Sequence, residues 1–300
     1  TLALQACGIG IGDEVLVQSL TYVASFQAIS ATGAKPVACD VVQETLCLDW
    51  RDAEQRLTPN TKAVMPVHYA GGVGSLDEIY VFAEKYGLRV IEDAAHAFGT
   101  IYQGKQVGGF GDVACFSFDG IKNITSGEGG CIVTDDDEIL RKVSDARLLG
   151  VEKDTQKRFS GKRSWDFDVT LQGWRYHMSN IMAAIGIEQL KRFPEFALKR
   201  QKLAKKYDSN FANYFQIQPV VNDYESVVPH IYVVYIESLK KRKKFQENLF
   251  KKGIQTGFHY QPNHWLKFYT SQHGKTFLPV TEDVFQNFLL YHCILTFLKL

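Results

Sequence analysis

The residue whose type and position most clearly suggest chemistry is Lys122. It follows the apolar run Val113–Phe118 and precedes the glycine-rich stretch Gly127–Gly130. A lysine held beside a buried strand is partly desolvated, which lowers the pKa of the amine and makes it a better nucleophile at neutral pH. Glycines also let the backbone pass close to a flat cofactor. A surface lysine in a glycine-rich hairpin would have the same sequence, so this segment alone leaves both interpretations open.

A second group, Asp93, ends the strand-like run 89–93 upstream of Lys122. A buried carboxylate there suits the ring nitrogen of pyridoxal phosphate, because that cofactor accepts electrons well only while the nitrogen stays protonated. His96 follows in the same segment and could contact the ring or its hydroxyl group. The alternatives are a helix N-cap for Asp93 and a structural role for His96.

These residues need elements to position them, and the first half of the chain alternates apolar runs with amphipathic stretches. Such alternation predicts an α/β domain whose mostly parallel central sheet is flanked by helices. Ligands of such sheets bind outside the carboxyl ends of the strands, which is where Asp93 lies. The expected strands are 14–17, 35–40, 61–67, 89–93, 113–118 and 131–134, and the expected helices are 22–32, 52–57 and 76–86.

The second half of the chain has a different pattern. Residues 150–173 are polar and lack a clear period, which predicts a long loop. We place a domain boundary at Phe193–Pro194, which gives a large domain at 1–193 and a smaller α+β C-terminal domain at 194–300. The expected elements around it are helices at 179–192, 195–214 and 239–252 and strands at 231–236 and 256–260.

Charge and hydropathy limit the possible partners. The 300 residues contain 34 Lys and Arg against 33 Asp and Glu, and a net charge of +1 disfavours a protein that follows nucleic-acid phosphates. No run of about 18 apolar residues is present, so we expect no spanning helix and no membrane partner. The basic run Lys240–Lys244 fits a solvated helix start better than a nucleic-acid or membrane patch.

Cysteines and glycine clusters point away from several other kinds of site. No cysteine lies in a C-x-x-C pair, so we expect no metal, and thiols in apolar runs indicate a reducing compartment, hence a cytoplasmic protein. Gly8–Gly12 follows a helix and precedes a strand, the reverse of a dinucleotide-binding loop. Gly71–Gly74 lacks the lysine of a P-loop, and a tight turn explains it better.

The order and spacing of several motifs resemble the DegT–StrS family of sugar aminotransferases, which are pyridoxal-phosphate enzymes. The strongest matches are Glu92–His96, Ser117–Lys122 and Gly127–Gly130. The resemblance implies an aspartate aminotransferase-like fold with pyridoxal 5′-phosphate as cofactor. Further matches run along nearly the whole chain, at Gly8–Val15, Thr21–Ala24, Met178–Gly186, His230–Val233 and His259–His264.

The resemblance also implies roles for individual residues. Lys122 would bind the cofactor covalently and later move the proton between Cα of the substrate and C4′ of the cofactor, while Asp93 would pair with the pyridinium nitrogen. His96 would lie near the ring hydroxyl, and Tyr22 would stack on the ring face. The remaining assignments are Ser117 for the phosphate and, on the sugar-nucleotide side, Tyr260 and His264.

Three places depart from the family pattern. The family's Gly-Thr phosphate-binding pair should precede Thr1, yet the chain opens in the second half of a helix, so we expect an incomplete N-terminus and weak cofactor binding. At Arg175 the family usually has an Asn that reaches the neighbouring subunit's phosphate, and Arg175 could supply a charged donor instead. Leu290–Leu295 matches the family's Leu-Pro-Leu-His-Pro stretch only loosely, and the small domain looks truncated.

The resemblance implies a homodimeric aminotransferase with its active site at the subunit interface. Glutamate would donate the amino group, and a nucleotide-linked keto sugar, in the first instance a 4-keto-6-deoxyhexose, would receive it. Such products belong to amino-sugar and surface-polysaccharide biosynthesis, including that of O-antigen lipopolysaccharide. Two alternatives stay open: a non-catalytic or regulatory relative, and an aminotransferase for a cyclitol or another ring without a nucleotide.

Overall fold

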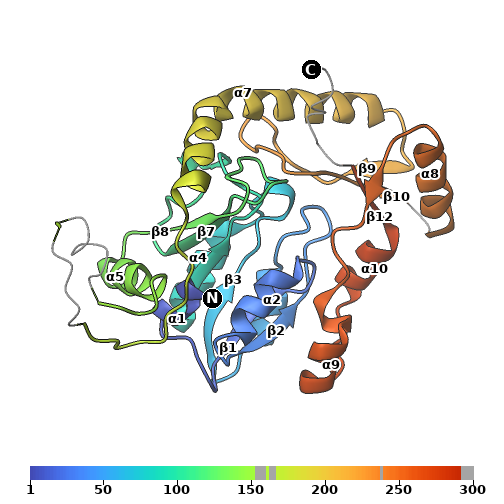
Figure 1. The fold of residues 1–300 in the computed structure, drawn as a ribbon. Helices are drawn as coiled ribbons and strands as arrows, with labels where there is room; N and C mark the ends of the chain where they lie inside the picture. The colour runs from blue at the N-terminus through green and yellow to red at the C-terminus, as the bar shows by residue number, and fades with distance from the viewer. Residues whose placement is uncertain (153–159, 162–166, 237–238, 292–300) are drawn as a thin grey trace.

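A six-stranded sheet dominates the computed structural model, which describes residues 1–152, 160–161, 167–236 and 239–291. The strand order is β2-β1-β3-β4-β7-β8 (Figure 1). All neighbours run parallel except β7 and β8, so the mostly parallel sheet predicted from the sequence is confirmed. The strands are β1 (Glu14–Gln18), β2 (Lys35–Cys39), β3 (Thr61–Met65), β4 (Arg89–Asp93), β7 (Val113–Ser117) and β8 (Gly130–Thr134).

Helices cover both faces of this sheet, because its strands are apolar on both sides. Successive side chains of a strand point to opposite faces. Val15 and Val17 of β1 therefore pack in one core with α1, α2 and α5, while Leu16 packs in another with α3 and α4. This two-sided burial is typical of parallel sheets. The helices are α1 (Leu2–Ala6), α2 (Val23–Ser30), α3 (Trp50–Gln55), α4 (Leu76–Tyr86) and α5 (Asp137–Ala146).

A smaller antiparallel sheet forms in the C-terminal part of the chain, with the order β11-β12-β10-β9. Helix α8 (Leu239–Lys251) packs Phe245 and Leu249 against Tyr232 and Val234 of this sheet. The strands are β9 (Ile217–Pro219), β10 (Tyr232–Ile236), β11 (Thr256–Gly257) and β12 (Phe288–Tyr291). The remaining elements are a hairpin of β5 (Ile101–Tyr102) and β6 (Lys105–Gln106), the 3-10 turns η1 (Tyr69–Gly71) and η2 (Asn263–Trp265), and helix α9 (Lys267–His273).

One helix, α7 (Asn180–Phe211), replaces the two helices predicted at 179–192 and 195–214. It runs through Pro194, and Figure 1 shows that its direction changes along its length. Proline lacks the N–H that an interior helix position donates and its ring crowds the preceding turn, so it bends a helix without always ending it. The prediction of separate helices was therefore wrong, and the boundary placed at Phe193–Pro194 falls inside α7.

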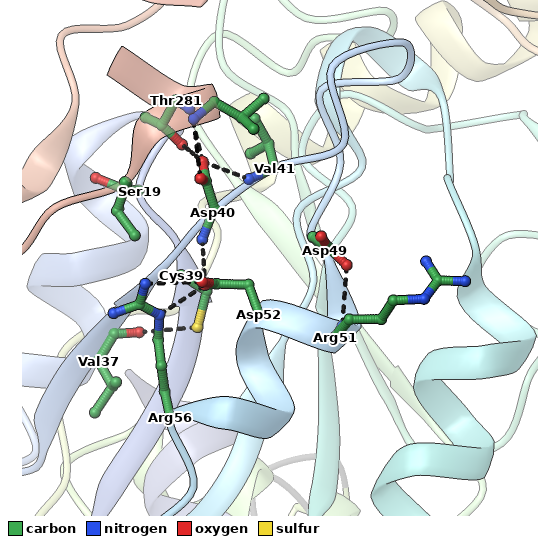
Figure 2. Close-up of polar contacts among 12 residues, drawn as sticks. Ser19, Val37, Cys39, Asp40, Val41, Asp49, Arg51, Asp52, Arg56 and Thr281 are labelled. Carbon is green, nitrogen blue, oxygen red and sulfur yellow. Dashed lines mark hydrogen bonds and ion pairs between the residues drawn. The ribbon is translucent and has the colours of Figure 1, made fainter. Parts of the chain in front are cut away.

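Helix α10 (Pro279–Asn287) is joined to the large sheet by a buried carboxylate, Asp40, which directly follows β2. The carboxylate accepts hydrogen bonds from the backbone N–H of Val280 at 3.0 Å and from the N–H and hydroxyl of Thr281, each at 2.6 Å. Figure 2 shows Asp40 between Thr281 and the Asp52 side chain, which accepts from the Asp40 N–H at 2.7 Å. Asp40 thus caps a helix that lies far from it in the sequence, where a negative charge is favoured.

The cysteines within the described residues are free thiols. Burial raises the pKa of Cys47 to about 11 and that of Cys115 to about 12, so neither is a reactive thiolate at neutral pH. Cys293 lies outside the described residues. Among the helices that the structure describes, none combines the length and apolar character needed to cross a membrane.

Candidate active site

A cavity of about 470 Å³ opens at the carboxyl ends of β4 and β7, the neighbouring parallel strands that end in Asp93 and Ser117. The position is the one expected for ligands of a parallel sheet. Segments far apart in the sequence line it together, namely the turn after β1, the residues that follow β4 and β7, and the stretch before η2. The predicted site residues among its lining are Tyr22, Asp93, His96, Ser117, Lys122 and Tyr260.

Asp93 is held in place by a short relay from α2. Its carboxylate accepts a hydrogen bond from Ser25 Oγ at 2.7 Å and another from the N–H of Ala95 at 3.2 Å. Ser25 Oγ lies 3.0 Å from Thr21 Oγ1, and because its own proton points to Asp93, Thr21 is the donor in that pair. Ser25 was not predicted from the sequence. The sequence indicated it only weakly, since the i, i+4 spacing of Thr21 and Ser25 at the start of a helix is the one feature that suggests their hydroxyls interact.

Lys122 lies in the turn that follows β7, and its amine faces the same cavity as Asp93. Burial lowers the pKa of Lys122, and the negative charges of Asp93 and Asp119 act in the opposite direction. The turn itself is ordered by the Lys122 N–H, which donates to the Asp119 carbonyl at 3.1 Å. The desolvation expected from the sequence is therefore present, together with a nearby carboxylate that keeps the amine from being isolated in an apolar site.

His96 lines the cavity, is buried, and lies beside a second histidine. Its Nε2 lies 3.4 Å from the Tyr260 hydroxyl, while its buried Nδ1 has no hydrogen-bond partner within the described residues. Its ring centroid lies 4.3 Å from that of His230. Burial lowers the pKa of His96 well below its ordinary value, and the positive charge of Lys122 adds to the effect. His96 is therefore a neutral imidazole at neutral pH, with one buried ring nitrogen that has no partner in the described residues.

Two tyrosines and a serine complete the lining. Tyr22 stands at the N-terminus of α2 with about half of its surface exposed, and its ring centroid lies 5.3 Å from that of Tyr260. The two rings offer the cavity an aromatic wall. Ser117 Oγ accepts a hydrogen bond from the Asp119 N–H at 3.4 Å, so its own proton is available to a ligand oxygen.

Two other predicted residues, both within the described part of the chain, lie outside this lining. His264 is buried, with Nδ1 2.6 Å from Ser19 Oγ and Nε2 3.3 Å from Glu282 Oε1. Arg175 is exposed and lies in a segment whose backbone bridges to Leu148. Within one subunit, the structure therefore brings neither His264 nor Arg175 to the residues around Lys122.

Comparison with known proteins identifies the family. The model of the DegT/DnrJ/EryC1/StrS aminotransferase family matches residues 1–297. The chain belongs to this family. Its members are pyridoxal-phosphate-dependent, and the α/β fold of this member is the aspartate aminotransferase-like fold expected from the sequence.

Several relatives match this family member over most of their length. An uncharacterized protein of Methanocaldococcus jannaschii, MJ1066, is 40% identical over 292 residues, which are 95% of this chain and 76% of the relative. The putative sugar aminotransferase Spr1654 of Streptococcus pneumoniae, solved in its PMP form, is 31% identical with a TM-score of 0.89 over 97% of this chain and 80% of that one. Helicobacter pylori PseC is 27% identical with a TM-score of 0.89, over 99% and 80% of the two chains.

The cavity of this aminotransferase-family chain has the groups that the family cofactor requires. A protonated ring nitrogen requires a carboxylate, which Asp93 would supply, and the aldehyde carbon requires a partly desolvated amine, which Lys122 would supply. The buried and unpartnered Nδ1 of His96 is a polar atom that lacks a partner in the protein alone. A buried polar atom without a partner, beside a cavity, indicates a site for a polar ligand. The residues present therefore fit pyridoxal phosphate.

Proposed function

We propose that this protein transfers the amino group of glutamate to a nucleotide-linked keto sugar. The observation that carries the proposal is that Lys122 and Asp93 line one cavity at the ends of adjacent strands, Lys122 with a lowered pKa. Family membership supports the class of reaction, and the nature of the acceptor is inferred. When bound, pyridoxal phosphate supplies an electron sink that stabilises negative charge on the amino-bearing carbon.

Each residue of the cavity has a different role in this proposal. Lys122 would hold the cofactor through its amine, and the free amine would take and return the proton at the reacting carbon as a general base. Asp93, oriented by Ser25, keeps the ring nitrogen protonated. His96 would contact the ring hydroxyl, Tyr22 would stack on the ring face, and Ser117 would bind the phosphate.

The relatives support a sugar as the acceptor, and its link to a nucleotide is our inference. PseC is described as an aminotransferase in the biosynthesis of pseudoaminic acid, and Spr1654 as a putative sugar aminotransferase. We infer a 4-keto-6-deoxyhexose linked to a nucleoside diphosphate, used for an amino sugar of a surface polysaccharide. Tyr260 lines the cavity next to Tyr22 and would contact the sugar. His264, in the same segment, would act on the sugar-nucleotide side by holding that segment against Ser19.

A homodimer would complete the site. The first part of α7 exposes large apolar side chains, among them Ile181 at 74%, Ile187 at 56% and Leu190 at 54%. Such a patch on a helix is typical of a surface that another chain covers. The exposed Arg175 lies just before this helix and would reach the phosphate bound by the partner subunit, as a charged hydrogen-bond donor.

The test follows the cofactor spectrum of the purified protein with pyridoxal phosphate. We expect glutamate to convert the cofactor to its amino form, and a nucleotide-linked keto sugar to convert it back. A panel of such sugars identifies the acceptor, and the matching free keto sugars serve as controls. Lys122→Ala should lose the lysine-dependent absorbance. Failure of every nucleotide sugar, with turnover of a free keto ring, would overturn the assignment of the acceptor.

A further inference from the structure

We infer that Asn123 is a positioning residue that fixes Lys122 relative to His96 and to the chain entering the small sheet, an inference that rests on the role proposed for Lys122. Asn123 directly follows Lys122 and is only 4% exposed. Its Nδ2 donates to the carbonyl of His96 at 3.3 Å and to the carbonyl of Val228 at 3.0 Å. One side-chain amide therefore joins three segments that lie far apart in the sequence.

The chemistry of these contacts explains why an amide is needed. Both partners of Asn123 are backbone carbonyls, which accept hydrogen bonds and cannot donate. A primary amide offers two N–H donors from a single nitrogen, so it satisfies both at once. A hydroxyl offers one donor and an apolar side chain offers none. Loss of the amide would leave two buried carbonyls without this donor, which is costly because they cannot turn to water.

The segment around Val228, whose carbonyl Asn123 binds, is itself hydrogen-bonded to residues that follow β3 and β4 of the large sheet. The Val228 N–H donates to Thr100 Oγ1 at 3.1 Å, and Thr100 Oγ1 donates to the Gly71 carbonyl at 3.0 Å. The His230 N–H donates to the Ala70 carbonyl at 2.9 Å. Gly71 has φ +104°, and a Cβ there would lie 2.6 Å from the Val228 carbonyl oxygen, so the two backbones are in close contact.

Asn123 is therefore a side-chain link between this anchored segment and the lysine turn. Ile121, on the other side of Lys122, is 59% exposed and its N–H donates only within the turn, to Asp119 Oδ1 at 3.0 Å, whereas the Asn123 side chain reaches two other segments. Removing the amide should let the turn move toward solvent. Lys122 would then be better hydrated, and the burial that lowers its pKa would diminish. The amine would then hold its proton more strongly and be less well aimed at the reacting carbon.

The test compares Asn123→Leu with Asn263→Leu. Asn263 is a matched control because it is fully buried and its Nδ2 also donates to two carbonyls, those of Ser19 at 3.0 Å and Thr21 at 2.8 Å. The readout is competitive acetylation of the cofactor-free protein across pH, with the peptide containing Lys122 quantified by mass spectrometry. Asn123→Ala serves in place of Asn123→Leu if the leucine variant does not fold.

We expect Asn123→Leu to move the acetylation midpoint of Lys122 upward and Asn263→Leu to leave it unchanged, although both lower the melting temperature. In the loaded enzyme, kcat should fall about 10- to 100-fold in Asn123→Leu, as for a misplaced catalytic group, with little change in KM for glutamate. An unchanged midpoint with an equal loss of melting temperature would show Asn123 to be purely structural. A shifted midpoint in a protein without transaminase activity would support the positioning role and refute the proposed function.

Discussion

Asp93 and Asp40 are both carboxylates at the carboxyl ends of parallel strands in one sheet, yet their surroundings differ. Asp93 ends β4, accepts hydrogen bonds from Ser25 and Ala95, and faces the cavity. Asp40 follows β2 and accepts from Val41, Val280 and Thr281, which occupy both of its oxygens. The comparison shows that one carboxylate at a strand end is occupied by the start of a helix, whereas the other faces a cavity where a ligand can bind it.

The largest expected effect comes from Lys122, the partner of Asp93 across the cavity. Lys122→Met should reduce transamination by at least about 10³-fold, because it removes the group that carries the proton. The cofactor-free variant should be more stable than the wild type at neutral pH, because burial lowers the pKa of Lys122 and the folded state therefore pays to hold the charged amine. Steady-state kinetics and urea denaturation measure the two effects. A variant that keeps a tenth of the activity would place the proton carrier elsewhere.

Asp93→Asn changes the cavity carboxylate with almost no change in shape. We expect kcat to fall about 10²- to 10³-fold, the range seen when one electrostatic stabiliser is lost. The loss of folding stability should be smaller than that for the Asp40 variant described next, because Asp93 accepts fewer hydrogen bonds from the protein. Comparable stability losses at Asp93 and Asp40 would remove the distinction between the two carboxylates.

Asp40→Ala should have the opposite effect to Asp93→Asn, with a large loss of folding stability and an unchanged cofactor site. We expect the free energy of unfolding to drop by about 2–4 kcal/mol, since a helix cap and further buried donors lose their acceptor. Cofactor spectra should be unchanged at temperatures where the variant stays folded, because Asp40 does not line the cavity. Denaturant titration and absorbance spectra measure the two properties. An altered spectrum of the folded variant would mean that docking of α10 shapes the active site.

We expect the loss of folding stability in acid to come from the buried histidine His230, which lies beside His96 of the cavity. Burial lowers the pKa of His230 well below 6.5, and the neighbouring His96 and Lys122 add to this shift. Below pH 6.5 the unfolded chain binds a proton that the folded chain does not, so the stabilisation present above this pH is lost as the pH falls. His230→Phe should flatten the acid branch of the stability curve by about 1.4 kcal/mol per pH unit. Parallel curves for the wild type and variant in acid would show that His230 is protonated in the fold.

The smallest effect is expected at Asp49, an ordinary N-cap shown beside the Asp40 cluster in Figure 2. Its carboxylate accepts from the Arg51 N–H at 3.0 Å at the start of α3. Asp49→Ala should cost about 1 kcal/mol of unfolding free energy, as for a typical cap. This local cap is the control for Asp40→Ala in the same denaturant titration. Equal losses of unfolding free energy in Asp49→Ala and Asp40→Ala would mean that the link between α10 and the large sheet stabilises the fold no more than an ordinary N-cap does.

Much of the fold was predictable because its signals are local. The alternation of apolar runs and amphipathic stretches predicted all strands of the six-stranded sheet within two residues of their ends. The pair Asp93 and Lys122 could be found because Asp93 ends one apolar strand and Lys122 follows another, at the edge where ligands of a parallel sheet bind. The prediction of separate helices at 179–192 and 195–214 was wrong because α7 continues through Pro194, where Phe193 packs on Phe98 and Phe196 is buried.

The sequence by itself determined the fold class, the family and the groups most able to do the chemistry, since these depend on residue types at short spacings. Tertiary structure decided which groups surround them. Ser25 meets Asp93 across 68 positions of the chain, Asn123 meets Val228 across 105, and Thr281 meets Asp40 across 241. No local pattern encodes such pairs, because a buried polar group takes whichever complementary partner the packing of the elements brings to it.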